Sequence, residues 1–220
     1  MKTNLRHHAG LLFVTAYFII VLFIGSIPIQ WIQALGFSLP ASIYFANTLF
    51  MIGHLITASI GLFLFWPILR KDWRWITQHK RRFILTVIIA FIVLVMVSTL
   101  VTPGTTTNQA ALNTMQATMR GWQTILFNVV IVFIGPMNEE FVFRQVLIGT
   151  LKKPIFKWMM WFVSSLLFGL LHIPSLSAIQ QIWPYFFDGL ILGFVYMKTK
   201  DNVMASYSVH LLNNLLSLII

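Results

Sequence analysis

The sequence predicts an all-α protein that forms a polytopic helical bundle in a membrane, with about seven transmembrane helices. Of its 220 residues, 58% are hydrophobic and only 9% are charged, and the mean hydropathy is +0.84. Soluble domains carry about 25% charged residues, so this composition is typical of a membrane protein. No soluble domain, linker or repeat is visible. We therefore expect residues 1–220 to form a single membrane-embedded domain.

The apolar residues are grouped in runs that can each cross a bilayer, which takes about 20 residues of helix. The runs cover residues 10–29, 43–68, 83–101, 122–151, 157–173, 182–198 and 202–220. The first run follows the basic residues Lys2 and Arg6 and has the general form of a signal peptide. It is too long for one, and no small-x-small cleavage site follows it. We expect it to be a retained first span.

Basic residues are confined to alternate connections between these runs. They are Lys2 and Arg6; Arg70, Lys71, Arg74, Lys80, Arg81 and Arg82; Lys152, Lys153 and Lys157; and Lys198 and Lys200. The other connections, 30–42, 102–119 and 174–181, contain no Lys or Arg, and Arg120 stands at the edge of the second. Cytoplasmic loops carry the excess of Lys and Arg, so the pattern predicts a cytoplasmic N-terminus and an external C-terminus. The net charge of +10 then reflects topology and not a nucleic-acid partner.

Four further features refine this picture. Tryptophans near the predicted span ends suggest an aromatic belt at the membrane surfaces; they are Trp31, Trp66, Trp73, Trp122, Trp158 and Trp183. Residues 102–119 form the one long polar connection, which we expect to be an external loop. Gly189 and Gly193 have the spacing that lets two helices approach closely. The absence of cysteine excludes disulfides, cysteine ligands and a cysteine nucleophile.

Two adjacent acids, Glu139 and Glu140, lie inside the fourth apolar run, although the whole chain has only five acids. An ionisable residue within a span costs at least roughly 2.5–3.5 kcal/mol on insertion scales, which marks a functional site by default. Glu140 and Arg144 are four residues apart, so on a helix they share a face in the favourable ion-pair order. Glu139 is turned about 100° away from that face. We expect Glu140 and Arg144 to be paired and Glu139 to be free for chemistry.

Two histidines and an asparagine lie inside later runs. His172 closes the fifth run, while His210 and Asn214 share a helix face in the last one. Polar groups on three separate spans have little reason to be in lipid unless they meet in the bundle interior. A carboxylate, two imidazoles and an amide can activate a water molecule. Glu139 would be the general base, assisted by His172 or a metal, and His210 with Asn214 would donate to a developing oxyanion.

The metal question stays open at this point. Glu139, His172 and His210 could supply the three protein ligands of a catalytic zinc site. Asparagine is a poor zinc ligand but a good donor, so a His210 that works with Asn214 would leave only two ligands. We favour the metal-free glutamate mechanism, with a divalent metal such as zinc as the alternative cofactor.

Other polar residues within the runs are expected to have lesser roles. His54 is interpreted as a packing residue, and Asp188 either orients a histidine or pairs locally. Ser206 shares the face of His210, but no acid stands one turn from His210 to orient it as the base of a serine nucleophile. Ser206 is therefore expected to bond back to its own helix.

The motifs Glu139-Glu140-x-x-x-Arg144, Phe168-x-x-x-His172 and His210-x-x-x-Asn214 together resemble those of the CPBP family. This family comprises CAAX proteases and bacteriocin-processing enzymes, also called Abi proteins. The resemblance covers residues 120–220 and implies an intramembrane endopeptidase that acts on a peptide or a membrane protein. Its site would consist of Glu139, Glu140, Arg144, His172, His210 and Asn214. The usual eukaryotic members have an eighth span, whereas this sequence shows seven apolar runs. We therefore expect the short bacterial type, many members of which resemble bacteriocin self-immunity proteins, in a bacterial plasma membrane.

Two other functions fit the same residues less well. Chains of Glu and His across helices also carry protons in transporters, but the sequence shows no inverted repeat and no paired broken helices. A non-catalytic immunity or binding protein of the membrane would not need every member of the constellation. We therefore expect an enzyme whose partners are a peptide substrate and the lipid bilayer, with no nucleic acid.

Overall fold

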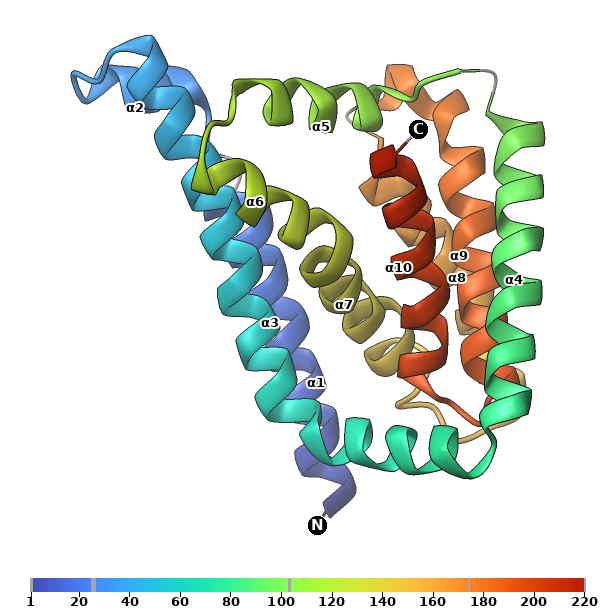
Figure 1. Cartoon of the computed structure of the whole chain (residues 1–220). Coiled ribbons are helices and arrows are strands. Elements are labelled where there is room, and N and C mark those ends of the chain that lie inside the picture. The colour runs from blue at the N-terminus through green and yellow to red at the C-terminus, as the bar shows by residue number, and fades with distance from the viewer. Residues whose placement is uncertain (1, 25–26, 103, 174, 220) are drawn as a thin grey trace.

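A computed structural model of the chain describes residues 2–24, 27–102, 104–173 and 175–219, and it is helical throughout, with no strand among these residues (Figure 1). The side chains of residues 2–7 and 22–24 lie outside the description. The predicted contribution of Lys2 and Arg6 to a basic end of the bundle falls there. The all-α prediction is confirmed for the described residues.

The elements follow one another along the chain as helices joined by short connections. They are α1 (Lys2–Tyr17), η1 (Phe18–Ile24), α2 (Ile29–Ala34), α3 (Leu39–Gln78), α4 (Lys80–Val101), α5 (Thr107–Thr118), α6 (Trp122–Val129), η2 (Val130–Ile134), α7 (Gly135–Glu140), η3 (Phe141–Val146), α8 (Pro154–Leu171), η4 (Leu176–Gln181), α9 (Ile182–Lys198) and α10 (Val203–Ile219). The elements η1, η2 and η3 are π-helical, and η4 is a 3-10 helix.

Four described helical segments are long and apolar enough to cross a membrane. They are Leu39–Gln78, Lys80–Val101, Trp122–Val146 and Pro154–Leu171. Two shorter apolar helices, His8–Val21 and Val203–Ile219, match the first and last predicted spans. The predicted sixth span, 182–198, has the bounds of α9. The predicted helical membrane bundle is confirmed.

Two connections differ from the sequence prediction. The basic stretch after residue 68 is not a loop, because α3 continues through Pro67 to Gln78. Figure 1 shows this last part of α3 bending to run across one end of the bundle. A proline within a helix removes one backbone hydrogen bond and crowds the preceding turn, which permits such a bend. The fourth span also ends at Val146, and not at residue 151.

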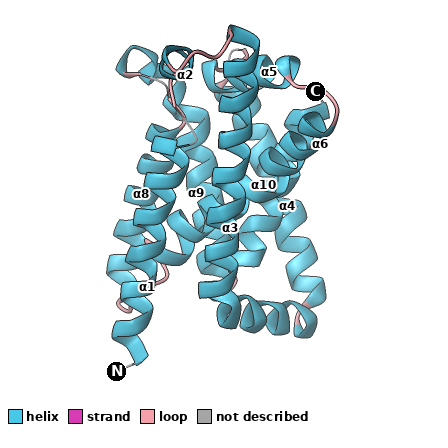
Figure 2. Ribbon diagram, turned by 90° about the vertical axis from the view of Figure 1, so that its left-hand side faces the viewer, coloured by secondary structure: helices cyan, strands magenta, loops and turns pink. Residues whose placement is uncertain are grey.

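The polar segment 102–119 is likewise helical. Thr106 caps α5 by accepting a hydrogen bond from the Gln109 N–H at 3.2 Å. Figures 1 and 2 both show α5 at the end of the bundle where the C-terminus lies, away from the N-terminus. The segment is therefore a capped helix and not a loop, while its external placement stays a prediction.

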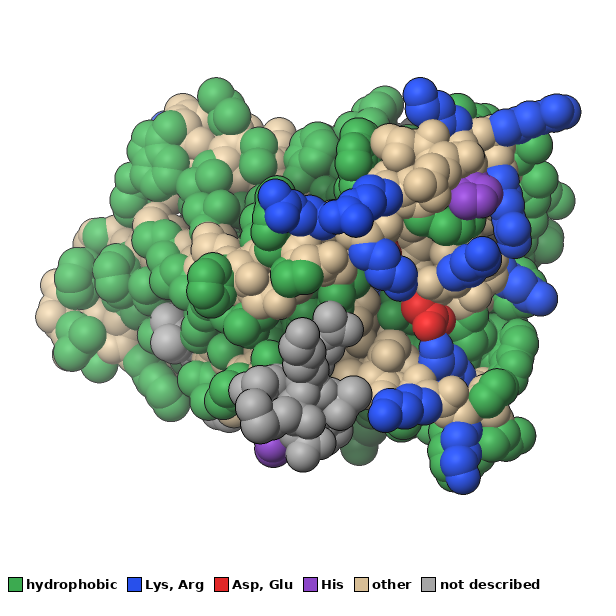
Figure 3. All heavy atoms as spheres, turned by 90° about the horizontal axis from the view of Figure 1, so that it is seen from below, with side chains coloured by type: hydrophobic (Ala, Val, Ile, Leu, Met, Phe, Trp, Pro, Cys, Tyr) green, Lys and Arg blue, Asp and Glu red, His purple; other side chains and the backbone are tan. Residues whose placement is uncertain are grey.

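The cationic side chains gather at the end opposite α5. Viewed from that end, Lys and Arg side chains cover much of one side of the surface (Figure 3). The residues come from the end of α3, the starts of α4 and α8, and the end of α9, as the sequence predicted. The six tryptophans proposed as a belt are each at least 44% exposed, so they can face lipid or the interface.

Helix packing near the centre depends on glycine. A Cβ at Gly189 of α9 would lie 2.8 Å from the Ser165 Cα of α8, and a Cβ at Gly193 would lie 2.6 Å from Trp161. The predicted packing role of the Gly189 and Gly193 pair is therefore confirmed. In the same way, Gly61 of α3 leaves room for the rings of Phe13 and Phe141.

Candidate active site

The helix that carries both glutamates is irregular on either side of them. The π-helical turns η2 and η3 flank α7, and Pro136 stands at the start of α7. In η2 the Gly135 N–H bonds to the Val130 carbonyl, five residues back. The same register would pair residue 136 with the Ile131 carbonyl, but proline has no N–H. Asn214 of α10 replaces it, donating from Nδ2 to the Ile131 oxygen at 2.9 Å.

The predicted ion pair between Glu140 and Arg144 is confirmed. Arg144 NH1 lies 3.2 Å from Glu140 Oε1, and the two side chains are only 1% and 0% exposed. The guanidinium also lies over the Phe168 ring, 4.7 Å from its centroid, and its NH2 reaches the Gly189 carbonyl at 3.5 Å. Through Arg144, the helix that carries the two glutamates is thus connected to α8 and α9 beside the cavity.

His210 lies between the two glutamates. Its Nδ1 is 3.1 Å from Glu140 Oε1, and its Nε2 is 3.6 Å from Glu139 Oε2. An ionised carboxylate only accepts hydrogen bonds, so Nδ1 carries the hydrogen in the contact with Glu140. Glu140 thereby fixes the ring and aims Nε2 toward Glu139. No acid stands one turn from His210 on its own helix; the acid that orients it comes from α7.

His172 is held at the end of α8. Its Nδ1 is 2.7 Å from the Phe168 carbonyl, and its ring stacks on Tyr185 with centroids 4.5 Å apart. A carbonyl can only accept, so Nδ1 is the donor and Nε2 keeps a lone pair for another partner. The sequence does not single out Tyr185, since one aromatic residue near the start of a span gives no signal.

A cavity of about 520 Å³ brings the predicted residues together. Glu139, His172, His210 and Asn214 line it from three spans, whereas Glu140 and Arg144 are buried beside it. His54 of α3 also lines it, and its Nδ1 has no hydrogen-bond partner among the described residues. The interpretation of His54 as a packing residue stays a prediction.

Helix α5 closes the cavity at the end opposite the basic residues. It contributes amide side chains to the lining, namely Asn108, Gln109, Asn113 and Gln116. Hydrogen bonds hold it at both ends. Thr107 N–H donates to Gln181 at 2.7 Å, and Gln116 donates to Asn128 at 3.0 Å. Thr106 and the Tyr185 hydroxyl are 2.6 Å apart, which connects α5 to the residue that stacks on His172.

The candidate zinc ligands do not form a complete set in this arrangement. Among the described residues, no three of His, Asp and Glu are placed so that they could hold one metal ion. His210 Nδ1 is occupied by Glu140, while its Nε2 lies 3.6 Å from Glu139 Oε2, a separation that two ligands of one ion could also have. The three candidate ligands are therefore not assembled as a set among the described residues, and the choice of a metal-free mechanism stays a prediction.

The two remaining predictions concern Asp188 and Ser206. Asp188 accepts a hydrogen bond from Ser98 of α4 at 2.9 Å, so it pairs across helices rather than with a histidine. Ser206 donates to the Val203 carbonyl of its own helix at 3.1 Å, as expected. Neither residue is arranged as a nucleophile or as its base.

Fold and site together define an integral membrane protein with a carboxylate–histidine centre inside a helical bundle. Residues 121–216 match the family described as type II CAAX prenyl endopeptidase Rce1-like. The matched region contains all three motifs on which the resemblance to the CPBP family was based.

The chain is also similar to an uncharacterized protein of Mycoplasma capricolum subsp. capricolum. The two are 33% identical over 96 residues, which is 44% of this chain and 27% of the Mycoplasma protein. The chain thus spans well under a third of that relative's length. No solved structure matches the chain.

Proposed function

We propose that the protein is an intramembrane endopeptidase in which Glu139 and His172 activate a water molecule for attack on a peptide bond. The main support is the cavity of about 520 Å³, onto which Glu139, His172, His210 and Asn214 converge from α7, α8 and α10. The match of residues 121–216 to the CAAX endopeptidase family supports the same chemistry.

Each residue has a role that follows from its contacts. Glu139 is 15% exposed and lines the cavity, and the other lining carboxylate, Asp188, already accepts a hydrogen bond from Ser98, so Glu139 accepts the proton of the attacking water. The free Nε2 of His172 accepts the second hydrogen of that water and orients it. Asn214 spends one amide hydrogen on the Ile131 carbonyl and has a second for the oxyanion. His210 can donate from Nε2 when both its ring nitrogens carry hydrogens.

The substrate and its side of approach are part of the proposal. With the basic end in the cytoplasm, as the positive-inside rule requires, the cavity extends toward the outer surface beneath α5. The amide side chains of α5 can hydrogen-bond an extended peptide backbone. We therefore place the substrate among peptides or membrane-protein segments at the outer face, in bacteriocin self-immunity or peptide processing, rather than among prenylated cytoplasmic tails.

The test is cleavage of a peptide library by purified protein in detergent or proteoliposomes. Glu139→Gln should lower the rate about 10²–10⁴-fold, the usual contribution of a general base. Asp201→Asn is the matched control, because it makes the same chemical change at a carboxylate that pairs with Lys157. The control should cleave like the wild type.

Cleavage by Glu139→Gln within tenfold of the wild type would remove Glu139 as the base. If no peptide is cleaved but proteoliposomes take up protons only when Glu139 is present, the protein is a transporter and the endopeptidase proposal is wrong.

A further inference from the structure

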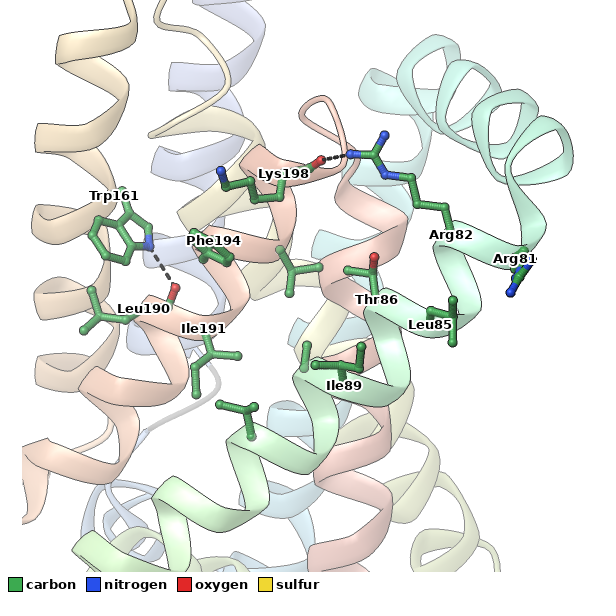
Figure 4. Close-up of a pocket in the computed structure, with 13 residues that line it drawn as sticks. Arg81, Arg82, Leu85, Thr86, Ile89, Trp161, Leu190, Ile191, Phe194 and Lys198 are labelled. Carbon is green, nitrogen blue, oxygen red and sulfur yellow. Dashed lines mark hydrogen bonds between the residues drawn. The ribbon is translucent and has the colours of Figure 1, made fainter.

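A second hollow lies on the lipid-facing side of the bundle, between α4, α8 and α9 (Figure 4). It has a volume of about 860 Å³ and shares no lining residue with the cavity of Glu139. We call it the α4–α9 groove. A ligand in this groove would therefore not contact the residues of the proposed peptidase site.

The walls of the α4–α9 groove are apolar and exposed. Leu85, Ile89 and Val93 of α4 are 48%, 60% and 42% exposed, and Phe194 of α9 is 44% exposed. Trp161 of α8 donates its indole N–H to the Leu190 carbonyl at 2.8 Å, so its polar atom is already satisfied. Apart from Thr86 of α4, the side chains that line the groove below its mouth offer no free polar atom, so the groove suits an apolar ligand.

The mouth of the groove is cationic. Figure 4 shows Arg81 and Arg82 at the start of α4 and Lys198 at the end of α9. Arg82 NH2 donates to the Lys198 carbonyl at 3.2 Å, which ties the two helix ends together. Among the described ion pairs, none joins these three cations to an acid. Their charge is available to an anion.

The length of the groove matches one leaflet of a bilayer. From Arg82 to Val93, α4 rises about 16 Å at about 1.5 Å per residue, and half of the hydrocarbon core is about 15 Å. An apolar groove of this length with a basic mouth has the layout of a phospholipid, with its chain within the membrane and its phosphate at the surface.

We propose that the α4–α9 groove binds one anionic phospholipid from the leaflet at the basic end of the bundle. The phosphate lies at Arg82 and Lys198, with the charge of Arg81 beside them, and one acyl chain lies along α4 against Phe194. Basic pockets between transmembrane helices are a recurring form of anionic lipid recognition, and arginine suits phosphate because its planar fork can donate two parallel hydrogen bonds.

The experiment measures retention of lipid by the purified full-length chain in mild detergent, by native mass spectrometry. Phosphatidylglycerol is compared with phosphatidylcholine of the same chains and with inorganic phosphate. Each Lys or Arg near an anionic surface contributes about fivefold in affinity, so Arg81→Ala/Arg82→Ala should weaken phosphatidylglycerol binding about 25-fold. The matched control, Lys152→Ala/Lys153→Ala, removes the same charge at the same end of the bundle and should change it less than twofold.

A second pair of variants tests whether the acyl chain of the lipid lies in the groove. Ile89→Ser places a hydroxyl in the groove, whereas Ile84→Ser does so on α4 at a residue that is 51% exposed and outside the groove. Only Ile89→Ser should weaken binding. If the double arginine variant does not fold, Arg81→Ala provides the same test at about fivefold, because this exposed side chain forms no described hydrogen bond or ion pair.

Three results would overturn the proposal. Equal retention of phosphatidylglycerol and phosphatidylcholine would mean that the mouth does not recognise charge. If both double variants lost phosphatidylglycerol affinity equally, the positive charge of this end of the bundle as a whole, and not the groove, would explain the binding. Displacement of the lipid by inorganic phosphate at equal concentration would show an anion site without a chain site.

Discussion

Replacing Arg144 by methionine should destabilise the protein by about 3–5 kcal/mol, the cost of leaving one member of a buried ion pair without its partner. The side chains of Arg144 and Glu140 are 1% and 0% exposed, so water cannot solvate the Glu140 carboxylate that remains. Methionine keeps most of the apolar volume against Phe168. The loss therefore comes from charge and not from a cavity.

The double variant Glu140→Gln/Arg144→Met should recover at least about 2 kcal/mol of that loss, because it leaves no buried charge unpaired while the glutamine oxygen still accepts from His210 Nδ1. The remaining loss comes from the contact of Arg144 with the Phe168 ring, a cation–π interaction that contributes up to about 2 kcal/mol when buried. Glu140→Gln on its own should be destabilised, since it leaves Arg144 unpaired.

The assay is helicity during titration of the detergent-purified protein with sodium dodecyl sulfate, and the three variants form a double-mutant cycle with the wild type. The reasoning would be refuted if the double variant were as unstable as Arg144→Met. It would also be refuted if the free energy of unfolding of Arg144→Met were within 1 kcal/mol of that of the wild type.

Three further predictions follow from contacts elsewhere in the bundle. Gly189→Ala should cost about 1–3 kcal/mol by overpacking against Ser165; Gly104→Ala, where an added Cβ meets nothing within 4 Å, should be neutral in the same titration. Ser98→Ala should cost about 1–3 kcal/mol because Asp188 loses its described donor, and Ser98→Thr should restore most of it. Prolonged chelation should leave peptidase activity unchanged, with only trace metal by elemental analysis; stoichiometric zinc lost together with activity would contradict the metal-free mechanism.

The parts of the site that sequence reasoning predicted are those that depend on spacing along one helix. Glu140 and Arg144 had to share a face at four residues' separation, and the structure places them 3.2 Å apart. The convergence of His172 and His210 on Glu139 was predicted from the cost of polar groups in lipid, without a geometry.

What the sequence did not indicate depends on contacts between helices. The acid that orients His210 is 70 residues away along the chain, so no local spacing shows it. Tyr185 acquires its place by stacking on His172. The helix α5 has no buried residue, so its polar sequence shows no apolar face from which a helix could be predicted. The hydrogen bonds that hold it reach distant residues such as Gln181.

The bond from Asn214 to the Ile131 carbonyl makes the loss of Asn214 ambiguous as evidence about catalysis. Asn214→Ala would remove the proposed donor to the reacting carbonyl group. It would also leave the Ile131 carbonyl without a hydrogen bond, because Pro136 has no N–H to donate to it. Any loss of rate would then combine chemistry with a loosened helix. Pro136→Ala offers a way to separate them, since alanine returns an N–H to the backbone. An enzyme that carries both substitutions isolates the chemical share of the asparagine.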